Sequence, residues 1–263
     1  PESLGAFLSG GHDTSFVFVK ASQVYDKPIH TFTAYFENFG FDECPKAEYV
    51  TRRFGGIHHR VPVGSKDLDW LPALVRLTEE PVPAGGFPIF ACIRKARCYA
   101  DALLTGDGGD TLWGEYYPVA EWSRCLSPLP FGLRLFLHRL IQAAAQVTDW
   151  ERFWEAEHVF HLFAERNIYR RFFDRLCSYR HYRYADLKRL LNPAMFETID
   201  FFSSALSIPV TRGNIDDALI ETKMLYGLYQ YMIPVTQKPL EGMSMLFHSP
   251  YLNKKVIDFI DSL

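Results

Sequence analysis

A short glycine-rich turn behind an apolar strand is the feature that most restricts how this chain can fold. The turn, Ser9-Gly10-Gly11-His12-Asp13-Thr14, follows the apolar run Leu4–Phe7 and leads into a helical pattern. Glycines let the backbone approach an anion closely, and the first N–H groups of the next helix point toward it. Asp13 adds an oxygen ligand for a hard cation such as Mg²⁺. The turn predicts a phosphate site, although a plain helix cap by Asp13 or Thr14 explains it equally well when it is taken alone.

A second turn of the same kind occurs further along the chain. The apolar run Ala102–Leu104 leads into Thr105-Gly106-Asp107-Gly108-Gly109-Asp110, which again combines glycines with carboxylates. Neither turn contains the Gly-Lys-Ser/Thr of a Walker P-loop. Because parallel strands present their carboxyl ends at one edge of a sheet, the two turns can face one polyphosphate and its metal from two sides. The pair therefore favours a nucleotide site over two unrelated caps.

Strand and helix patterns alternate in the first part of the chain. The patterns predict strands at about 4–9, 30–36, 58–63 and 102–106. They predict helices between these strands, at about 13–22, 42–54, 67–79 and 87–100. This alternation predicts an α/β fold in which a parallel sheet carries helices on both faces.

From about residue 119 onward the pattern is helical almost throughout. Apolar residues recur at three-to-four spacing in Arg134–Val147, Trp150–Arg166, Met195–Leu206, Asp216–Met232 and Asn253–Ile260. No linker composition separates this part from the first. We therefore predict a single domain over residues 1–263, with an α/β nucleotide-binding core at 1–118 and a mainly helical part at 119–263.

Composition is that of an ordinary globular enzyme domain. Apolar residues make up 48% and charged residues 22% of the chain, and no stretch approaches the roughly 18 apolar residues of a membrane helix. The net charge of −3 gives no general attraction to nucleic acid. The five cysteines lack metal-site or disulfide spacing, so reduced thiols and a cytoplasmic location are expected.

One basic segment suggests a different class of partner. Between Glu165 and Leu190, seven Arg and one Lys stand against three acids, interleaved with Tyr and Phe. Such interleaving is typical of RNA binding, but on a helix it more often marks an aromatic core face beside a solvated basic face. We favour the second interpretation, so nucleic acid is not an expected partner.

The two turns together point to a family. Ser-Gly-Gly-x-Asp-Ser/Thr followed by Gly-Asp-Gly-Gly-Asp resembles the synthetase domain of the glutamine-dependent asparagine synthetases, in the ATP pyrophosphatase (PP-loop) superfamily. Further segments resemble the family in its order: His30–Glu37, Asp42-Glu43, Gly56–His59, Glu79–Pro81, Met243–Met245 and Pro250–Asn253. The resemblance covers about residues 4–118 and 225–262. It implies an adenine nucleotide α-hydrolase-like fold extended by a C-terminal helical region.

The resemblance also implies a reaction. ATP and a carboxylate, with aspartate as the expected acid, give an acyl-adenylate and pyrophosphate, and ammonia or an amine then displaces AMP. ATP and Mg²⁺ are the implied cofactors. Nothing near Pro1 matches the N-terminal Cys nucleophile of the family's glutaminase domain. We therefore expect that domain to be absent from this chain and present elsewhere in the full-length protein, and a homodimer remains open.

The resemblance assigns binding residues as well. ATP or pyrophosphate is expected to contact the first turn, at Leu8, Ser9, Gly10, Gly11, Asp13 and Thr14. Asp13 and Asp110 match the family's metal-holding carboxylates. Thr105 and Gly106 match positions near the ribose and adenylate, and Ala34 is expected to line the adenine pocket.

Two residues are catalytic candidates. Asp107 stands where asparagine synthetases keep an acid and β-lactam-forming relatives a Tyr, so we expect it to accept a proton or orient the substrate. Lys238 lies one place before the Lys of the family pattern Lys-x-Asp-Arg, which here reads Pro239–Gly242. A flexible Lys can still supply the required point charge if the loop shifts.

Other departures leave the substrate open. Thr111 replaces the Glu that usually follows the second turn, and the segment after Met245 is shorter and lacks the family's Glu-x-Arg. Three interpretations therefore stand: asparagine formation from aspartate, amide, lactam or macrolactam formation on another acid, or a degenerate domain that binds nucleotide or a partner without turnover.

Overall fold

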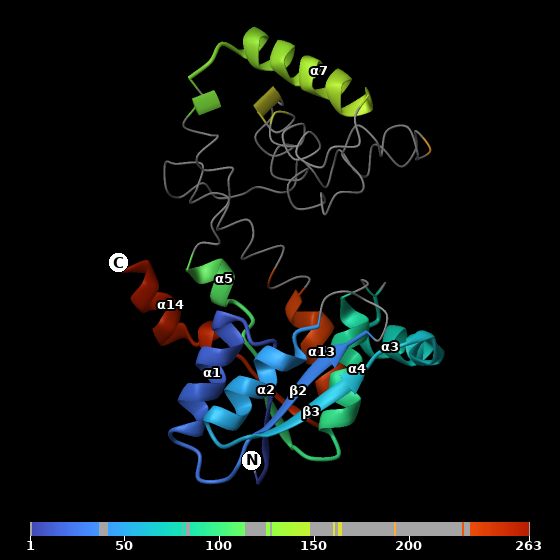
Figure 1. Ribbon diagram of the computed structural model, residues 1–263, viewed down its shortest axis with the longest axis vertical. Coiled ribbons are helices and arrows are strands. Elements are labelled where there is room, and N and C mark those ends of the chain that lie inside the picture. Colours follow the sequence, from blue (N-terminus) through green and yellow to red (C-terminus); the bar gives the residue numbers. More distant parts are fainter. Residues whose placement is uncertain are drawn as a thin grey trace. The chain divides into compact units, whose positions relative to one another are not determined.

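The chain folds into two compact units in the computed structural model. One is formed by Pro1–Trp113 with Leu228–Leu263, and the other by Gly114–Gly227 (Figure 1). The structure describes residues 2–36, 42–80, 82, 85–113, 125–126, 128–147, 160, 163–164, 192, 228 and 232–262. Both glycine-rich turns lie in the first unit.

A five-stranded parallel sheet forms the centre of the first unit, in the order β3-β2-β1-β4-β5. The strands are β1 (Leu4–Phe7), β2 (His30–Tyr35), β3 (Ile57–Pro62), β4 (Ala102–Leu104) and β5 (Leu246–His248). Since every pairing is parallel, all five carboxyl ends lie at one edge. The predicted α/β fold with a parallel sheet is confirmed.

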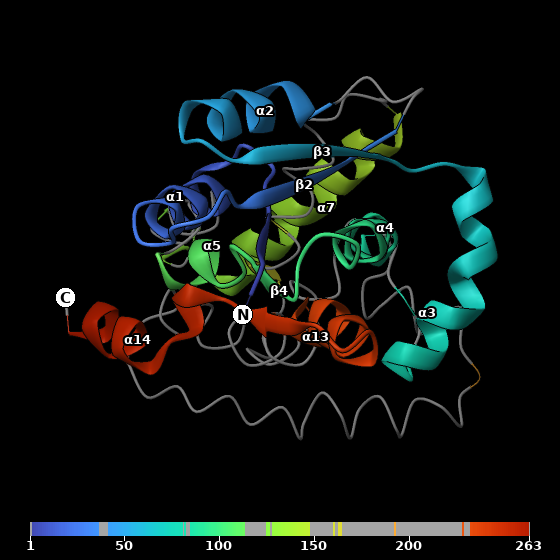
Figure 2. The ribbon, with the colours of Figure 1, turned by 90° about the horizontal axis from the view of Figure 1, so that it is seen from below.

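Helices cover both faces of this sheet (Figure 2). Alternate strand residues point to opposite faces, so each face has its own apolar set. On one face α1 (His12–Ser22) and α2 (Cys44–Arg53) pack over Ala6 and Leu104. On the other, α4 (Gly86–Ala96) and α13 (Ile233–Gly242) pack over Phe32 and Leu103.

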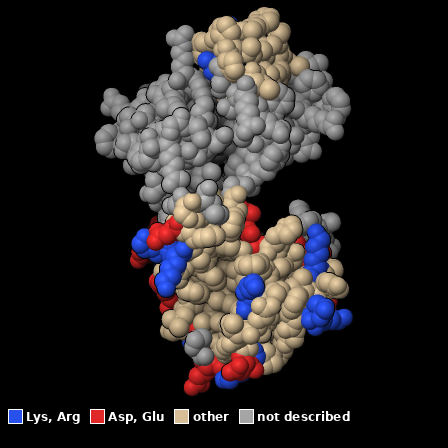
Figure 3. Space-filling view, turned by 90° about the vertical axis from the view of Figure 1, so that its left-hand side faces the viewer, with Lys and Arg blue, Asp and Glu red and all other residues tan. Residues whose placement is uncertain are grey.

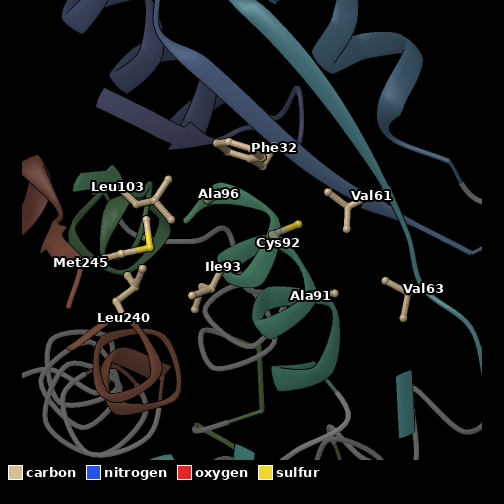
Figure 4. Packing of buried hydrophobic residues seen from close by; sticks show 10 residues of the cluster. All are labelled: Phe32, Val61, Val63, Ala91, Cys92, Ile93, Ala96, Leu103, Leu240 and Met245. Carbon is tan, nitrogen blue, oxygen red and sulfur yellow. The ribbon is translucent and has the colours of Figure 1, made fainter. Parts of the chain in front are cut away.

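The α4–α13 face carries the first core cluster (Figure 4). Its buried members are Phe32, Val61, Val63, Ala91, Cys92, Ile93, Ala96, Leu103, Leu240 and Met245. Strands, α4 and the C-terminal α13 all contribute to it. The C-terminal residues therefore complete the core of a sheet whose first four strands lie in the first 104 residues.

Shorter elements connect this framework. They are a 3₁₀ helix η1 (Ser65–Trp70), α3 (Leu71–Thr78), α5 (Gly109–Leu112), a 3₁₀ helix η3 (Pro250–Leu252) and α14 (Lys254–Asp261). In the second unit the structure describes α7 (Phe131–Val147), which confirms the helix predicted at 134–147 and extends it by one turn. The helices predicted at 150–166, 195–206 and 216–232 lie almost wholly outside the described residues, as does the basic segment 165–190.

Two C-terminal elements were not predicted from sequence. Strand β5 has only three residues, and Leu246 is 63% exposed, so no apolar alternation marks it. Helix α13 contains Pro239, a residue that normally argues against a helix interior. Residues 233–262 were assigned to a mainly helical part, yet they supply an edge strand of the sheet. The division of a single domain at residue 118 stays a prediction.

Leu240 tests how strongly α13 is anchored to the sheet. Its side chain is 0% exposed in the first core cluster, so Leu240→Ala leaves a cavity and should destabilise the first unit by about 2–5 kcal/mol. Leu68→Ala is the matched control, because Leu68 is 57% exposed and its truncation should stay within about 0.5 kcal/mol. Urea unfolding followed by circular dichroism measures both. Equal unfolding midpoints for the two variants would contradict the packing of α13.

Candidate functional site

The two glycine-rich turns meet at the carboxyl ends of neighbouring strands. β1 and β4 pair in parallel, with Gly5 opposite Leu103 and Ala6 opposite Leu104. The winding of the sheet reverses here, because β2 and β3 extend it to one side of β1 while β4 and β5 extend it to the other. In open α/β sheets, ligands bind at this switch point. The topology therefore places both turns where a ligand is expected.

The first turn is held by its own hydroxyl groups. The Ser9 N–H donates to Thr14 Oγ1 (3.2 Å), the two hydroxyl oxygens lie 3.0 Å apart, and the Gly11 N–H donates to Ser9 Oγ (3.2 Å). Gly11 is the N-cap of α1, and no side chain caps this helix end. The simple cap by Asp13 or Thr14 is therefore not what the structure shows. The N-terminal N–H groups of α1 keep the arrangement that suits an anion.

Glycines of the second turn make room for the first. A Cβ on Gly109 would lie 2.4 Å from Cγ of Asp13 and 2.6 and 2.8 Å from its two carboxylate oxygens. A Cβ on Gly106 would lie 2.9 Å from Cγ2 and 3.0 Å from the backbone N of Thr14. Any larger residue at these two positions would push the turns apart. The Asp13 carboxylate occupies the space that the missing side chain of Gly109 leaves.

Asp13 and Asp110 form a carboxylate pair across this contact. Burial raises the pKa of Asp13, and a hydrogen bond and the charge of Asp110 raise it further. No group of three or more His, Cys, Asp or Glu in the described residues could hold a metal on its own. Mg²⁺ commonly takes one or two carboxylates and completes its shell with substrate phosphates and water. The pair therefore fits a magnesium ion that arrives with a polyphosphate.

Asp107 keeps one carboxylate oxygen without a partner. Its Oδ2 is inaccessible to solvent and accepts no hydrogen bond from the described residues. Burial raises the pKa of this carboxyl, and a hydrogen bond from the Thr105 side chain lowers it in part. The Asp107 N–H also points to Thr105 Oγ1 at 3.4 Å. A buried carboxyl with a raised pKa exchanges its proton closer to neutral pH, which suits an acid–base role.

Other predicted residues lie further from the turns. Leu8 packs in the core over α1, so only its backbone can reach a ligand at this edge. Ala34 on β2 packs against the first core cluster. Lys238 on α13 donates to the Thr78 carbonyl (2.6 Å) and to Glu80 Oε1 (3.2 Å). Within the described part of the chain, the polar contacts of Lys238 thus lie at the end of α3 and not at the two turns.

The segment after β5 contacts the second turn, although none of its residues was predicted as a site residue. The Ser249 hydroxyl donates to the Asp107 carbonyl (2.5 Å). Burial raises the pKa of Tyr251, and the charges of Asp13 and Asp110 raise it further. These residues could not be placed from sequence because the short strand β5 that precedes them was not predicted. Once it is known to pair with β4, the residues that follow it must lie beside the second turn.

A model of the family described as asparagine synthase matches residues 2–260, almost the whole chain. The chain belongs to the asparagine synthase family. It is 34% identical over 116 residues to a protein of Methanocaldococcus jannaschii provisionally named asparagine synthetase (glutamine-hydrolyzing) 2, covering 43% of this chain and 22% of that protein. It is 29% identical over 140 residues to asparagine synthetase (glutamine-hydrolyzing) 1 of Bacillus subtilis, covering 51% of this chain and 22% of that protein.

A third relative gives the same result. A protein of Mycobacterium tuberculosis, provisionally named asparagine synthetase (glutamine-hydrolyzing), is 34% identical over 136 residues, covering 51% of this chain and 20% of that protein. The matched stretch of this asparagine synthase domain thus spans about a fifth of the length of these curated relatives. The family resemblance predicted from the two turns is confirmed.

The surface of this asparagine synthase domain shows no single-sign field on the face drawn in Figure 3, where acidic and basic side chains are interspersed in the described part. Among the described helices, none combines the length and apolar character needed to cross a bilayer.

Gly109→Ala tests the contact between the second turn and the Asp13 carboxylate. The new Cβ would lie 2.4 Å from Cγ of Asp13, so it should displace the carboxylate and weaken magnesium-dependent ATP binding by about tenfold or more. Gly85→Ala is the control, because a Cβ there meets nothing within 4 Å. Titration calorimetry with ATP, with Mg²⁺ and with EDTA, measures the difference. An affinity unchanged by Gly109→Ala would rule out Asp13 as a ligand in this arrangement.

Proposed function

We propose that this chain is the ATP-dependent synthetase domain of an amide-forming ligase that activates a carboxylic acid as its adenylate. The observation that carries the proposal is the meeting of two glycine-rich turns and their Asp13–Asp110 pair at the switch point of a parallel sheet. Membership of the asparagine synthase family supports it. The proposed site residues are those of the two turns, together with Ala34 and Lys238.

The proposed reaction has two steps. A carboxylate oxygen of the substrate attacks the α-phosphorus of ATP, and the bond to the bridging oxygen breaks, which releases pyrophosphate. The nitrogen of ammonia or an amine then attacks the acyl carbon, AMP leaves, and the nitrogen loses a proton. Both steps depend mainly on holding the reactants in line and on stabilising negative charge.

The residues divide this work between the two turns. The N–H groups at the start of α1 and the hydroxyls of Ser9 and Thr14 bind the leaving pyrophosphate. Asp13 and Asp110 would hold Mg²⁺, which when bound neutralises phosphate charge. Asp107 is the proposed proton acceptor or orienting group for the attacking nitrogen, because its Oδ2 has no hydrogen-bond partner among the described residues.

Aspartate is the first proposed acid, and ammonia the proposed nitrogen source. The names of the relatives describe glutamine-hydrolyzing asparagine synthetases, which supports a glutaminase domain in the full-length protein. The four cysteines that the structure describes are free thiols, which supports the proposed cytoplasmic location. The absence of Glu-x-Arg after Met245 favours keeping a different acid as the second candidate.

Pyrophosphate release with candidate acids distinguishes the functions. With ATP, Mg²⁺ and ammonium, we expect release to depend on the acid added, and stimulation by aspartate supports asparagine formation. Asp13→Asn should abolish release because the metal loses a carboxylate ligand. Asp258→Asn is the matched control, since Asp258 only pairs with Lys254 on the exposed face of α14. Stimulation by another acid alone would contradict aspartate as substrate. If no acid works while ATP still raises thermal stability, the domain binds nucleotide without turnover.

Lys238→Ala separates a catalytic charge from a helix cap. If Lys238 stabilises the charged transition state, turnover should fall by about 100-fold while ATP affinity stays unchanged. The structure also shows Lys238 bound to the last carbonyl of α3, a contact that stabilises helix ends. Glu80→Gln removes the ion-pair partner and serves as the control. A Lys238→Ala variant that melts earlier but keeps its full turnover would make Lys238 structural only.

A further inference from the structure

A segment far away in sequence holds the backbone of the second turn. The Thr105 N–H donates to the His248 carbonyl (3.0 Å), which continues the pairing of β4 with β5 by one residue. The Ser249 hydroxyl then donates to the Asp107 carbonyl (2.5 Å). Ser249 is only 5% exposed, so this bond is shielded from water. Two successive residues of the C-terminal segment therefore bind two residues of the turn.

The same C-terminal segment also packs closely against Gly108, the next residue of the turn. Gly108 has φ +94°, in the left-handed region that favours glycine. A Cβ there would lie 2.8 Å from Cδ2 of Leu252 and 3.5 Å from Cβ of Tyr251. The peptide between Asp107 and Gly108 is thus held by a hydrogen bond at its carbonyl and by η3 packed against its glycine.

This restraint acts on the Asp107 side chain, whose present conformation is energetically unfavourable. A buried carboxylate oxygen without a partner is costly, and a free turn would rotate until that oxygen met water or a donor. Asp107 Oδ2 is buried and has no hydrogen-bond partner in the part of the chain that the structure describes. The Ser249 bond holds the backbone from which this side chain projects, so it resists that rotation.

We infer that Ser249 is a positioning residue, which keeps Asp107 oriented so that its unpartnered oxygen remains available to a donor group of the substrate. This role rests on the proposed function for the chemistry of Asp107. The geometry of the restraint is independent of it. Ser249 acts through Asp107 and does not itself touch the reacting atoms.

Variants at position 249 test the hydroxyl. Ser249→Ala should lower kcat by about tenfold and leave KM for ATP unchanged, because the first turn keeps its own bonds. Ser249→Thr keeps the hydroxyl and should retain most of the activity, whereas the isosteric Ser249→Val should not. Ser262→Ala is the control, since it removes a similar bond, from Ser262 Oγ to the Phe259 carbonyl (2.6 Å), at the end of α14.

The pH dependence gives a readout that lost packing alone would not move. Burial raises the pKa of Asp107, and the bond from Thr105 opposes this shift. When the turn loosens, water reaches the carboxyl and its pKa should fall toward the ordinary value. The limb of the pH–rate profile that belongs to Asp107 should therefore shift to lower pH in Ser249→Ala and Ser249→Val, and not in Ser249→Thr or Ser262→Ala.

Carbon-13 NMR titration of the Asp carboxyls in the nucleotide-free chain keeps the two proposals separable. The Asp107 signal is assigned by its loss in Asp107→Asn. A lower Asp107 pKa in Ser249→Val than in Ser249→Thr supports positioning even if no acid yields pyrophosphate, a result that would overturn only the proposed function. If the Thr and Val variants share the same Asp107 pKa and the same kcat, Ser249 has no positioning role.

Discussion

The parallel pairing of β1 with β4 is the constraint on which the rest of the site depends. It brings two turns from distant parts of the sequence to one edge of the sheet, in register. The turns can then touch only because Gly106 and Gly109 lack side chains where Thr14 and Asp13 approach. The pairing of β1 with β4 places the two turns at the same edge of the sheet, and the glycines allow the turns to approach each other closely. Together they bring the carboxylates of Asp13 and Asp110 close together, although two like charges repel each other.

That contact has an energetic consequence. Burial raises the pKa of Asp13, and the hydrogen bond and charge of Asp110 raise it further, so the fold holds the charged form of this carboxyl at a cost. A group with a raised pKa stabilises the fold below its unfolded pKa and loses that contribution as pH rises through the folded pKa. Near neutral pH the pair therefore lowers the stability of the fold. Its strain is relieved by the ligand that the site is proposed to bind.

Local patterns made most of the first unit predictable from sequence. β1, β2, β3 and β4 alternate with helices of regular period, and the two turns follow their strands directly, so neighbouring residues carry the whole signal. β5 and α13 could not be predicted from such local patterns. β5 has only three residues and an exposed Leu246, so it shows no alternation of apolar and polar residues. Pro239 lies inside α13, although proline is normally unfavourable in a helix interior. The position of Lys238 on the end of α3 depends on how α13 packs, which no local pattern encodes.

The two turns differ in what holds them, and this difference bears on specificity. Ser9, Gly11 and Thr14 bind one another, so the first turn carries its shape in its own residues. The second turn relies on His248 and Ser249, from the segment after Met245 that lacks the Glu-x-Arg of the family pattern. A change in that segment can alter the setting of Asp107 while the bonds within the first turn persist. Under the proposed function, such a chain would keep its nucleotide site and change the acid it activates, because separate parts of the sequence would control the two.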